Sequence, residues 1–192
     1  KNKYYYWITY CTGIVLFALI GSIGASRVIK DYQIMRLIVF LDPSVDPLGS
    51  GWNIIQSITA IGSGGFSGLG FLQGTQSHYR FLPQQSTDFI FSILSEEWGF
   101  VGGLTVFSLY LVIMIRGIII IRKTENRFGT LIATGIVSMF LFHFTVNVGM
   151  VMGIMPITGI PLLFLSYGGS SLWTALSATG LLMSINMRRL DH

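Results

Sequence analysis

Long apolar stretches alternate with polar segments along this chain, and they predict membrane-spanning helices. About 20 apolar residues are needed to cross the ~30 Å hydrocarbon core of a bilayer. Four stretches are long enough to do so: residues 4–24, 98–121, 128–151 and 170–187. Residues 25–97, between the first two stretches, are far more polar. The pattern predicts an all-α integral membrane protein with four transmembrane helices, a single membrane domain and one large loop.

Local signals divide the large loop further. Residues 41–51 (LDPSVDPLGSG) predict a cluster of turns, because two Asp-Pro pairs and two glycines interrupt any helix. Residues 53–61 predict a short amphipathic helix lying on the membrane surface. Ser86 or Thr87 can cap a helix that begins at Asp88.

Composition agrees with a membrane protein and excludes several other classes. Hydrophobic residues make up 52% of the 192 residues and charged residues only 10%, against about 25% in a soluble domain. A single cysteine, Cys11, excludes a disulfide framework. The net charge of +4, without basic runs interleaved with aromatic residues, does not indicate nucleic-acid binding. Three histidines and one cysteine without metal-ligand spacing do not predict a structural metal site.

The basic residues predict the orientation of the chain. The loop 25–97 carries four basic residues against six acids, whereas the other side is strongly basic. Basic residues favour the cytoplasmic side of a membrane. We therefore expect both ends of the chain in the cytoplasm and the loop outside. The residues on the expected cytoplasmic side are Lys1, Lys3, Arg122, Lys123, Arg127, Arg188 and Arg189.

The candidate chemistry centres on Asp88, a carboxylate in an otherwise apolar run. In a helix that begins at Asp88, Ser92, Ser95 and Glu96 would share its face, which is typical of a cleft lining. The alternative is a first-turn carboxylate favoured by the helix dipole, with Glu96 marking the membrane interface. From the residues alone the two interpretations are equally good.

Other polar groups also have a functional and a structural interpretation. The glycine-rich segment 62–70 could cradle a phosphate, but backbone that needs positive φ angles explains it better. The loop cations, among them Arg36 and Arg80, could bind a pyrophosphate or form a solvated surface. Interhelical hydrogen bonds explain His143 and Asn147 without any chemistry.

Taken together, a series of motifs resembles the SEDS family (shape, elongation, division and sporulation) of RodA/FtsW/SpoVE-type membrane proteins. Their order and spacing cover nearly the whole chain, and the double Asp-Pro segment looks more like the elongation members than the division members. The matching motifs are DYQ at 31–33, LDPSVDPLGSGW at 41–52, IGSGG at 61–65, GTQS at 74–77, TDFIF at 87–91, EEWG at 96–99, NVGM at 147–150 and GIMPITGIPLLFLSYGGSS at 153–171.

The resemblance implies the last four spans of a ten-helix fold in the cytoplasmic (inner) membrane. It also implies a peptidoglycan glycosyltransferase that polymerises lipid II at the outer membrane face for cell elongation. Asp88 would be the catalytic general base. Substrate binding would involve Arg36, Arg80, Gln76, Ser77, Thr87 and Glu96. The implied partner is a class B penicillin-binding protein, and a divalent cation, Mg²⁺ or Mn²⁺, could assist the leaving pyrophosphate.

Two functions from other classes stay open. A lipid II flippase would use similar headgroup contacts, but it needs many polar residues inside the spans, and this chain has few. A non-catalytic scaffold for the penicillin-binding protein would need no Asp88 carboxylate.

Overall fold

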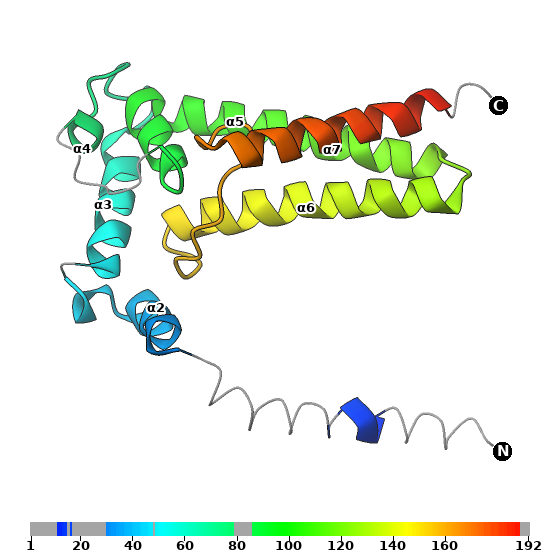
Figure 1. Ribbon diagram of the computed structural model, residues 1–192. Helices are drawn as coiled ribbons and strands as arrows, with labels where there is room; N and C mark the ends of the chain where they lie inside the picture. Colours follow the sequence, from blue (N-terminus) through cyan, green and yellow to red (C-terminus); the bar gives the residue numbers. More distant parts are fainter. Residues whose placement is uncertain (1–10, 15, 17–29, 48, 79–85, 189–192) are drawn as a thin grey trace. The chain divides into compact units, whose positions relative to one another are not determined.

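The computed structural model describes residues 11–14, 16, 30–47, 49–78 and 86–188, and its described segments are helices, turns and loops without a strand. The chain divides into two compact units, residues 1–38 and 39–192, and each is described by itself (Figure 1). The expected first span, 4–24, lies outside the described residues apart from 11–14 and 16, which are helical. Helix α2, Asp31–Leu41, contains the boundary between the two units.

The predicted turn cluster is confirmed at the start of the second unit. The 3-10 helix η1, Pro43–Val45, is capped by Asp42, whose Oδ1 accepts hydrogen bonds from the amide (3.0 Å) and the hydroxyl (2.5 Å) of Ser44. These bonds stabilise the ionised carboxylate and lower the pKa of Asp42. Oδ2 of Asp46 then accepts from the amide of Ser50, where the next helix begins.

Helix α3, Ser50–Ser63, confirms the predicted short helix and extends it at both ends. Its buried residues recur every three positions, so one stripe of the helix packs against other parts of the protein. That packing is against α5 and α6, at the end of the bundle where α5 begins and α6 ends (Figure 1). The buried stripe consists of Gly51, Ile54, Ser57 and Ala60.

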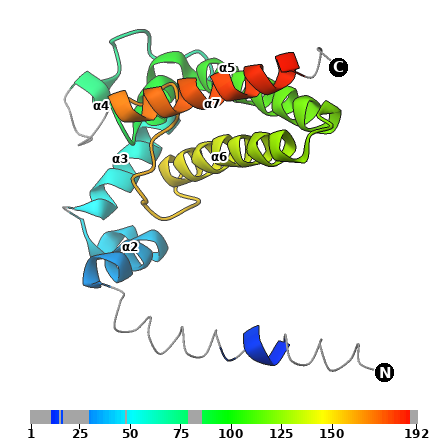
Figure 2. The same ribbon diagram turned by 45° about the vertical axis from the view of Figure 1, so that its right-hand side comes forward.

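Three long helices lie side by side in the second unit: α5, Ile90–Lys123; α6, Arg127–Val151; and α7, Gly169–Arg188 (Figures 1 and 2). They confirm helices over the last three expected spans. Only α5 and α6 are both long and apolar enough to cross a membrane among the described residues. The crossing of α7, and hence the count of four spans, stays a prediction.

The core between α5 and α6 is aromatic. The ring of Phe144 on α6 lies 4.9 Å from Phe107 and 4.6 Å from Tyr110, both on α5. Offset and edge-on ring pairs at such distances are favourable. At the opposite end of the pair, the Asn126 side chain caps α6 by accepting from the amide of Phe128 at 3.0 Å. Aromatic packing and a local cap thus hold the helical hairpin together.

Helix α5 is interrupted at Gly99, whose φ is +63°. In a continuous helix the carbonyls of Glu96 and Glu97 would accept from the amides four residues later. Here they accept instead from Leu69 and Gly70, each at 3.0 Å. The glycine-rich segment 64–70 therefore supplies donors for one side of the break.

The same segment supplies acceptors for the other side. The amides of Phe100 and Val101 donate to the carbonyls of Gly65 (2.9 Å) and Phe66 (3.3 Å). The four backbone groups that would pair with one another in a continuous helix thus all have partners in the segment 64–70, as buried amides and carbonyls require. Backbone this close leaves no room for a side chain: a Cβ on Gly68 would lie 2.1 Å from the Glu97 carbonyl oxygen. Glycines 65, 68 and 70 have positive φ, which confirms that this segment needs glycine for its backbone conformation.

Candidate active site

Asp88 lies in a turn, residues 86–89, rather than in a helix. The expectation that a helix begins at Asp88 is therefore wrong, since α5 begins at Ile90 and Phe89 precedes it without a side-chain cap. The physical reason is that distant donors, rather than local helical ones, bind the carbonyls of this turn. The Asp88 residue itself is half-buried.

Two residues of the segment between α6 and α7 fix the first part of the turn. The Ser166 hydroxyl donates to the carbonyl of Thr87 at 2.6 Å, and the Tyr167 amide donates to that of Ser86 at 2.7 Å. Oγ of Ser166 also accepts from the Leu162 amide at 2.7 Å, which holds the segment in a compact loop. The turn before α5 and the loop before α7 are therefore one hydrogen-bonded unit.

Asn147 on α6 fixes the last part of the turn. Its Nδ2 donates to the carbonyls of Asp88 (2.9 Å) and Ile160 (2.8 Å), and the side chain is fully buried. The Asp88 carboxylate faces the same loop, because a Cβ built on Gly159 would lie 3.4 Å from Oδ2. Three successive carbonyls, from residues 86 to 88, are thus held from outside the turn.

Residues 152–168, the loop that faces Asp88, are themselves anchored to α5 and α6. Nδ1 of His143 lies 3.0 Å from the Pro161 carbonyl, so this nitrogen carries the proton. The Tyr110 hydroxyl donates to the carbonyl of Leu163. Hydrogen bonding thus accounts for His143 and Asn147 as the sequence predicts, although their partners are loop carbonyls rather than another helix.

The polar stripe predicted as a cleft lining is buried instead. The Ser92 hydroxyl is within 2.6 Å of the Ser57 hydroxyl, which also donates to the carbonyl of Val151 at 2.7 Å. Both serines are fully buried, and Ser95 is 5% exposed. These groups hold α3, α5 and α6 together at one point, and since Asp88 precedes the helix, it does not belong to the stripe.

Glu96 is fully buried and holds another segment in place. Its Oε1 accepts from the amide of Gln76 (2.8 Å) and the hydroxyl of Thr75 (3.2 Å), at the start of the short helix α4, Thr75–His78. Glu96 therefore ties α4, which includes Ser77, to α5. The structure thus brings Glu96 and Gln76 together through the Gln76 backbone amide.

Two further candidates lie outside the described part of the second unit. Arg36 belongs to the first unit, where its guanidinium carbon lies 5.7 Å from the centre of the Tyr32 ring. A contact of this kind is a cation–π interaction. Arg80 lies outside the described residues.

Comparison with known proteins accounts for the motifs. Residues 4–190 match the sequence model of the FtsW/RodA/SpoVE family, described as a cell cycle protein. This chain belongs to that family. Over 189 residues it is 68% identical to the peptidoglycan glycosyltransferase RodA of Treponema pallidum (strain Nichols), which covers 98% of this chain and 44% of that relative. The resemblance found in the sequence is therefore confirmed.

A second relative and a solved structure are also similar to this chain. The peptidoglycan glycosyltransferase MrdB of Escherichia coli (strain K12) is 44% identical over 183 residues, 95% of this chain and 50% of the relative. A solved structure, described as structural coordination of polymerization and crosslinking by a peptidoglycan synthase complex, matches with a TM-score of 0.73 and 31% identity. That match covers 97% of this chain and 51% of the solved one. The chain spans about half the length of the curated relatives it matches.

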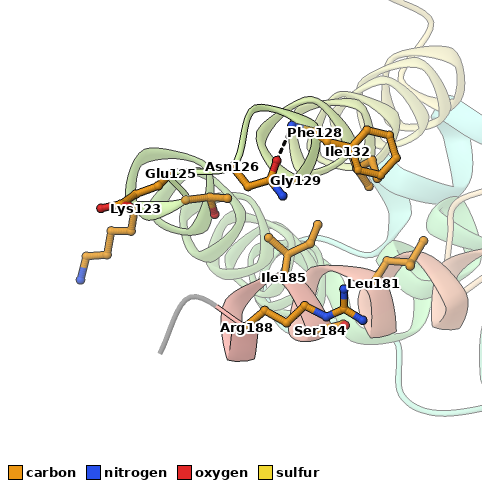
Figure 3. A pocket seen from close by; sticks show the side chains of 11 residues that line it. Lys123, Glu125, Asn126, Phe128, Gly129, Ile132, Leu181, Ser184, Ile185 and Arg188 are labelled. Carbon is orange, nitrogen blue, oxygen red and sulfur yellow. Dashed lines mark hydrogen bonds between the residues drawn. The ribbon is translucent and has the colours of Figure 1, made fainter. Parts of the chain in front are cut away.

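One cavity among the described residues of this family member lies at the opposite end of α5 from Asp88. It has a volume of about 520 Å³ and is formed by the turn between α5 and α6 and the last part of α7 (Figure 3). Its lining includes Asn126, Ile132, Leu181, Ile185 and Arg188, and none of the predicted site residues. We therefore place the candidate site by hydrogen bonding and family motifs rather than by cavity size.

The described residues hold no group of three or more His, Cys, Asp or Glu side chains that could bind a metal ion by themselves. Mg²⁺ usually binds through only one or two protein carboxylates together with substrate phosphates and water. The divalent cation that the resemblance implies therefore stays a prediction, and no step below is assigned to it.

Sequence reasoning missed the residues that hold the Asp88 turn, Asn147 and Ser166, as parts of the site. Both lie in motifs that carry the family resemblance, NVGM and the segment ending in SYGGSS. A buried amide inside an apolar helix was the available signal, because such a group needs a partner to offset its desolvation. The sequence does not say which partner that is.

Proposed function

We propose that the protein containing this chain is a peptidoglycan glycosyltransferase that polymerises lipid II at the outer face of the cytoplasmic membrane, in cell elongation. The names of its relatives and the membership of the family support this activity. The observation that carries the assignment of the site is the Asp88 turn. A half-buried carboxylate is held there on backbone fixed by three hydrogen bonds from other elements.

The reaction we propose is a single displacement with inversion. The acceptor's 4-hydroxyl oxygen attacks the anomeric carbon of the donor sugar while the bond from that carbon to the undecaprenyl pyrophosphate oxygen breaks. The Asp88 carboxylate takes the hydroxyl proton as general base, and the pyrophosphate leaves as an anion with the electron pair. A fixed backbone suits this role, because general-base catalysis needs the carboxylate within hydrogen-bonding reach of the acceptor.

The remaining candidates fit supporting roles. Arg36 and Arg80 would stabilise the charge of the leaving pyrophosphate, which is a suitable ligand for guanidinium groups. Thr87, Gln76 and Ser77 would contact the substrate beside Asp88. Glu96 would act indirectly, since its buried carboxylate holds the start of α4.

The partner we propose is a class B penicillin-binding protein, which would cross-link the new glycan strand. The solved structure that resembles this chain comes from a peptidoglycan synthase complex, and this supports a shared assembly.

A flippase and a scaffold are the competing functions. The polar side chains within α6 do not favour a transport path, because His143 and Asn147 are bonded to loop carbonyls. A scaffold would give no reason to hold a carboxylate in this manner. Neither protein would make glycan strands from purified lipid II, and only the glycosyltransferase would.

The test is strand synthesis by the full-length protein, obtained by placing this chain in the matched 44% of the Treponema pallidum relative. Asp88→Asn keeps the size of the side chain but accepts no proton at neutral pH. We expect the initial rate on purified lipid II to fall roughly 10²–10⁴-fold.

Asp42→Asn, at an exposed carboxylate, is the matched control and should leave the rate unchanged. A near-normal rate for Asp88→Asn would assign the chemistry elsewhere. An equal loss for Glu96→Gln and Asp88→Asn would indicate a shared structural site.

We also propose that the chain termini are cytoplasmic and that residues 25–97 face outward. Cysteines at Ser44 and Glu125, both exposed, test this in a Cys11→Ser background with an impermeant maleimide. In intact, wall-stripped cells we expect labelling at position 44 only. Labelling at position 125 alone would reverse the topology.

A further inference from the structure

Asn147 connects the two structural elements on either side of the Asp88 carboxylate. One bond from its Nδ2 holds the backbone of Asp88 itself (2.9 Å), and the other holds Ile160 (2.8 Å), the neighbour of Gly159. Gly159 is the residue that the carboxylate faces. The single amide group therefore fixes the carboxylate relative to the opposing loop.

These two bonds use both hydrogens of the Asn147 side-chain amide. An amide nitrogen has two hydrogens, and both are donated. Oδ1 of Asn147 is buried and accepts no hydrogen bond from any described residue. Its carbonyl partners belong to segments 59 and 13 residues away in the sequence, so no local structure replaces the bonds.

We propose that Asn147 is a positioning residue for the proposed general base Asp88. The inference rests on the proposed function. Without the two donated bonds, Ser166 and Tyr167 still hold the first part of the turn, but the carbonyls of Asp88 and Ile160 are released. The carboxylate can then shift from the place from which it takes the acceptor proton. Displacements of about 1 Å lower enzymatic rates by roughly 100-fold. Substrate affinity depends on other groups, so the effect falls on kcat and leaves KM unchanged.

Asn147→Leu tests the proposal in the full-length protein described above, because leucine has a similar branched shape without donors. We expect kcat for strand synthesis from lipid II to fall roughly 10–100-fold, with KM within about twofold. Tyr110→Phe is the matched control, since it also removes a buried side-chain bond to the loop, at Leu163, but does not touch the turn. Its kcat should stay within about threefold of the unmodified protein.

A double-variant cycle decides whether Asn147 acts through Asp88. In the Asp88→Asn background, Asn147→Leu should have no further effect on the residual rate, because the group it positions is already inactive. Ser166→Ala removes the bond to the Thr87 carbonyl, and it should also lower kcat by itself but have no further effect in the Asp88→Asn background. This variant tests whether the turn positions Asp88 if Asn147→Leu does not fold.

Equal losses of kcat in Asn147→Leu and Tyr110→Phe would overturn the proposal, and so would the same fold-loss with and without Asp88. These outcomes differ from failure of the proposed function. A normal rate in Asp88→Asn would remove the general base itself, whereas an inactive Asp88→Asn protein beside a normal Asn147→Leu protein would remove only the positioning role.

Discussion

Asp88 and Glu96 are eight residues apart, yet the protein surrounds these two carboxylates in opposite ways. At Glu96 the side chain is fully buried and its oxygen is bonded to the start of α4. At Asp88 the Asn147 side chain holds the backbone carbonyl, and the residue stays half-buried. A fully buried carboxylate is shielded from solvent and stabilises structure, whereas a half-buried one on a fixed backbone can exchange a proton. The difference separates a structural acid from a candidate base.

The largest effect expected in this comparison is on stability at Glu96. Glu96→Ala leaves the Gln76 amide without its acceptor and opens a cavity, so we expect a loss of about 3 kcal/mol in the free energy of unfolding. Asp88→Ala should cost less than about 1 kcal/mol. Denaturant titration of the chain in detergent micelles measures both. Equal losses at the two positions would abolish the distinction between them.

The next effect concerns the glycine-rich segment that pairs with the carbonyls of Glu96 and Glu97. Gly68→Ala combines a positive φ of 80° with a backbone contact of 2.1 Å, and we expect it to cost about 2–3 kcal/mol. Gly65→Ala is the matched control, since its φ is also positive (54°) but no atom lies within 4 Å of the new Cβ. That change should cost about 1 kcal/mol. Thermal unfolding of the two variants measures the difference. Equal unfolding midpoints would contradict the packing argument.

The smallest expected effect is that of Gly62→Ala, which tests where the glycine-rich segment begins. Gly62 lies inside α3, and a Cβ there meets nothing within 4 Å. Gly62→Ala should therefore raise the free energy of unfolding by roughly 0.4–1 kcal/mol, because alanine restricts the unfolded chain and favours a helix. The same titration in micelles measures the change. A loss of stability would mean that the backbone requirement for glycine begins before residue 64.

The sequence predicts the long helices well and the site poorly, for a physical reason. Apolar length defines α5 and α6 to within a few residues at most ends, because a long apolar run has few alternatives to a helix. The start of α5 was predicted two residues too early. Ser86 and Thr87 predict a local helix cap. In the structure their carbonyls instead accept hydrogen bonds from Ser166 and Tyr167, about 80 residues later.

Likewise, only part of the candidate site could be predicted from the sequence. Asp88 is recognisable from one carboxylate in an apolar run and from the family motif around it. Its surroundings are not, because they depend on which carbonyls Asn147 reaches in the folded chain. The spacing of polar residues also gave a wrong prediction at Ser92. Polar residues three and four positions apart indicate a shared helix face, but they do not say whether that face meets solvent or packs against Ser57.

The interruption of α5 at Gly99 has a consequence for biosynthesis. Residues 64–70 leave the ribosome before α5 does, and they hold the only described partners for the four backbone groups at the break. Before they dock, the same four groups can pair with one another in a continuous helix, so the break at Gly99 need not exist in the newly made chain. Docking of residues 64–70 exchanges those helical bonds for bonds to the loop. The break in α5 and the folding of the preceding loop therefore form one assembly step, and a defect in residues 64–70 would alter the shape of a helix whose own sequence is intact.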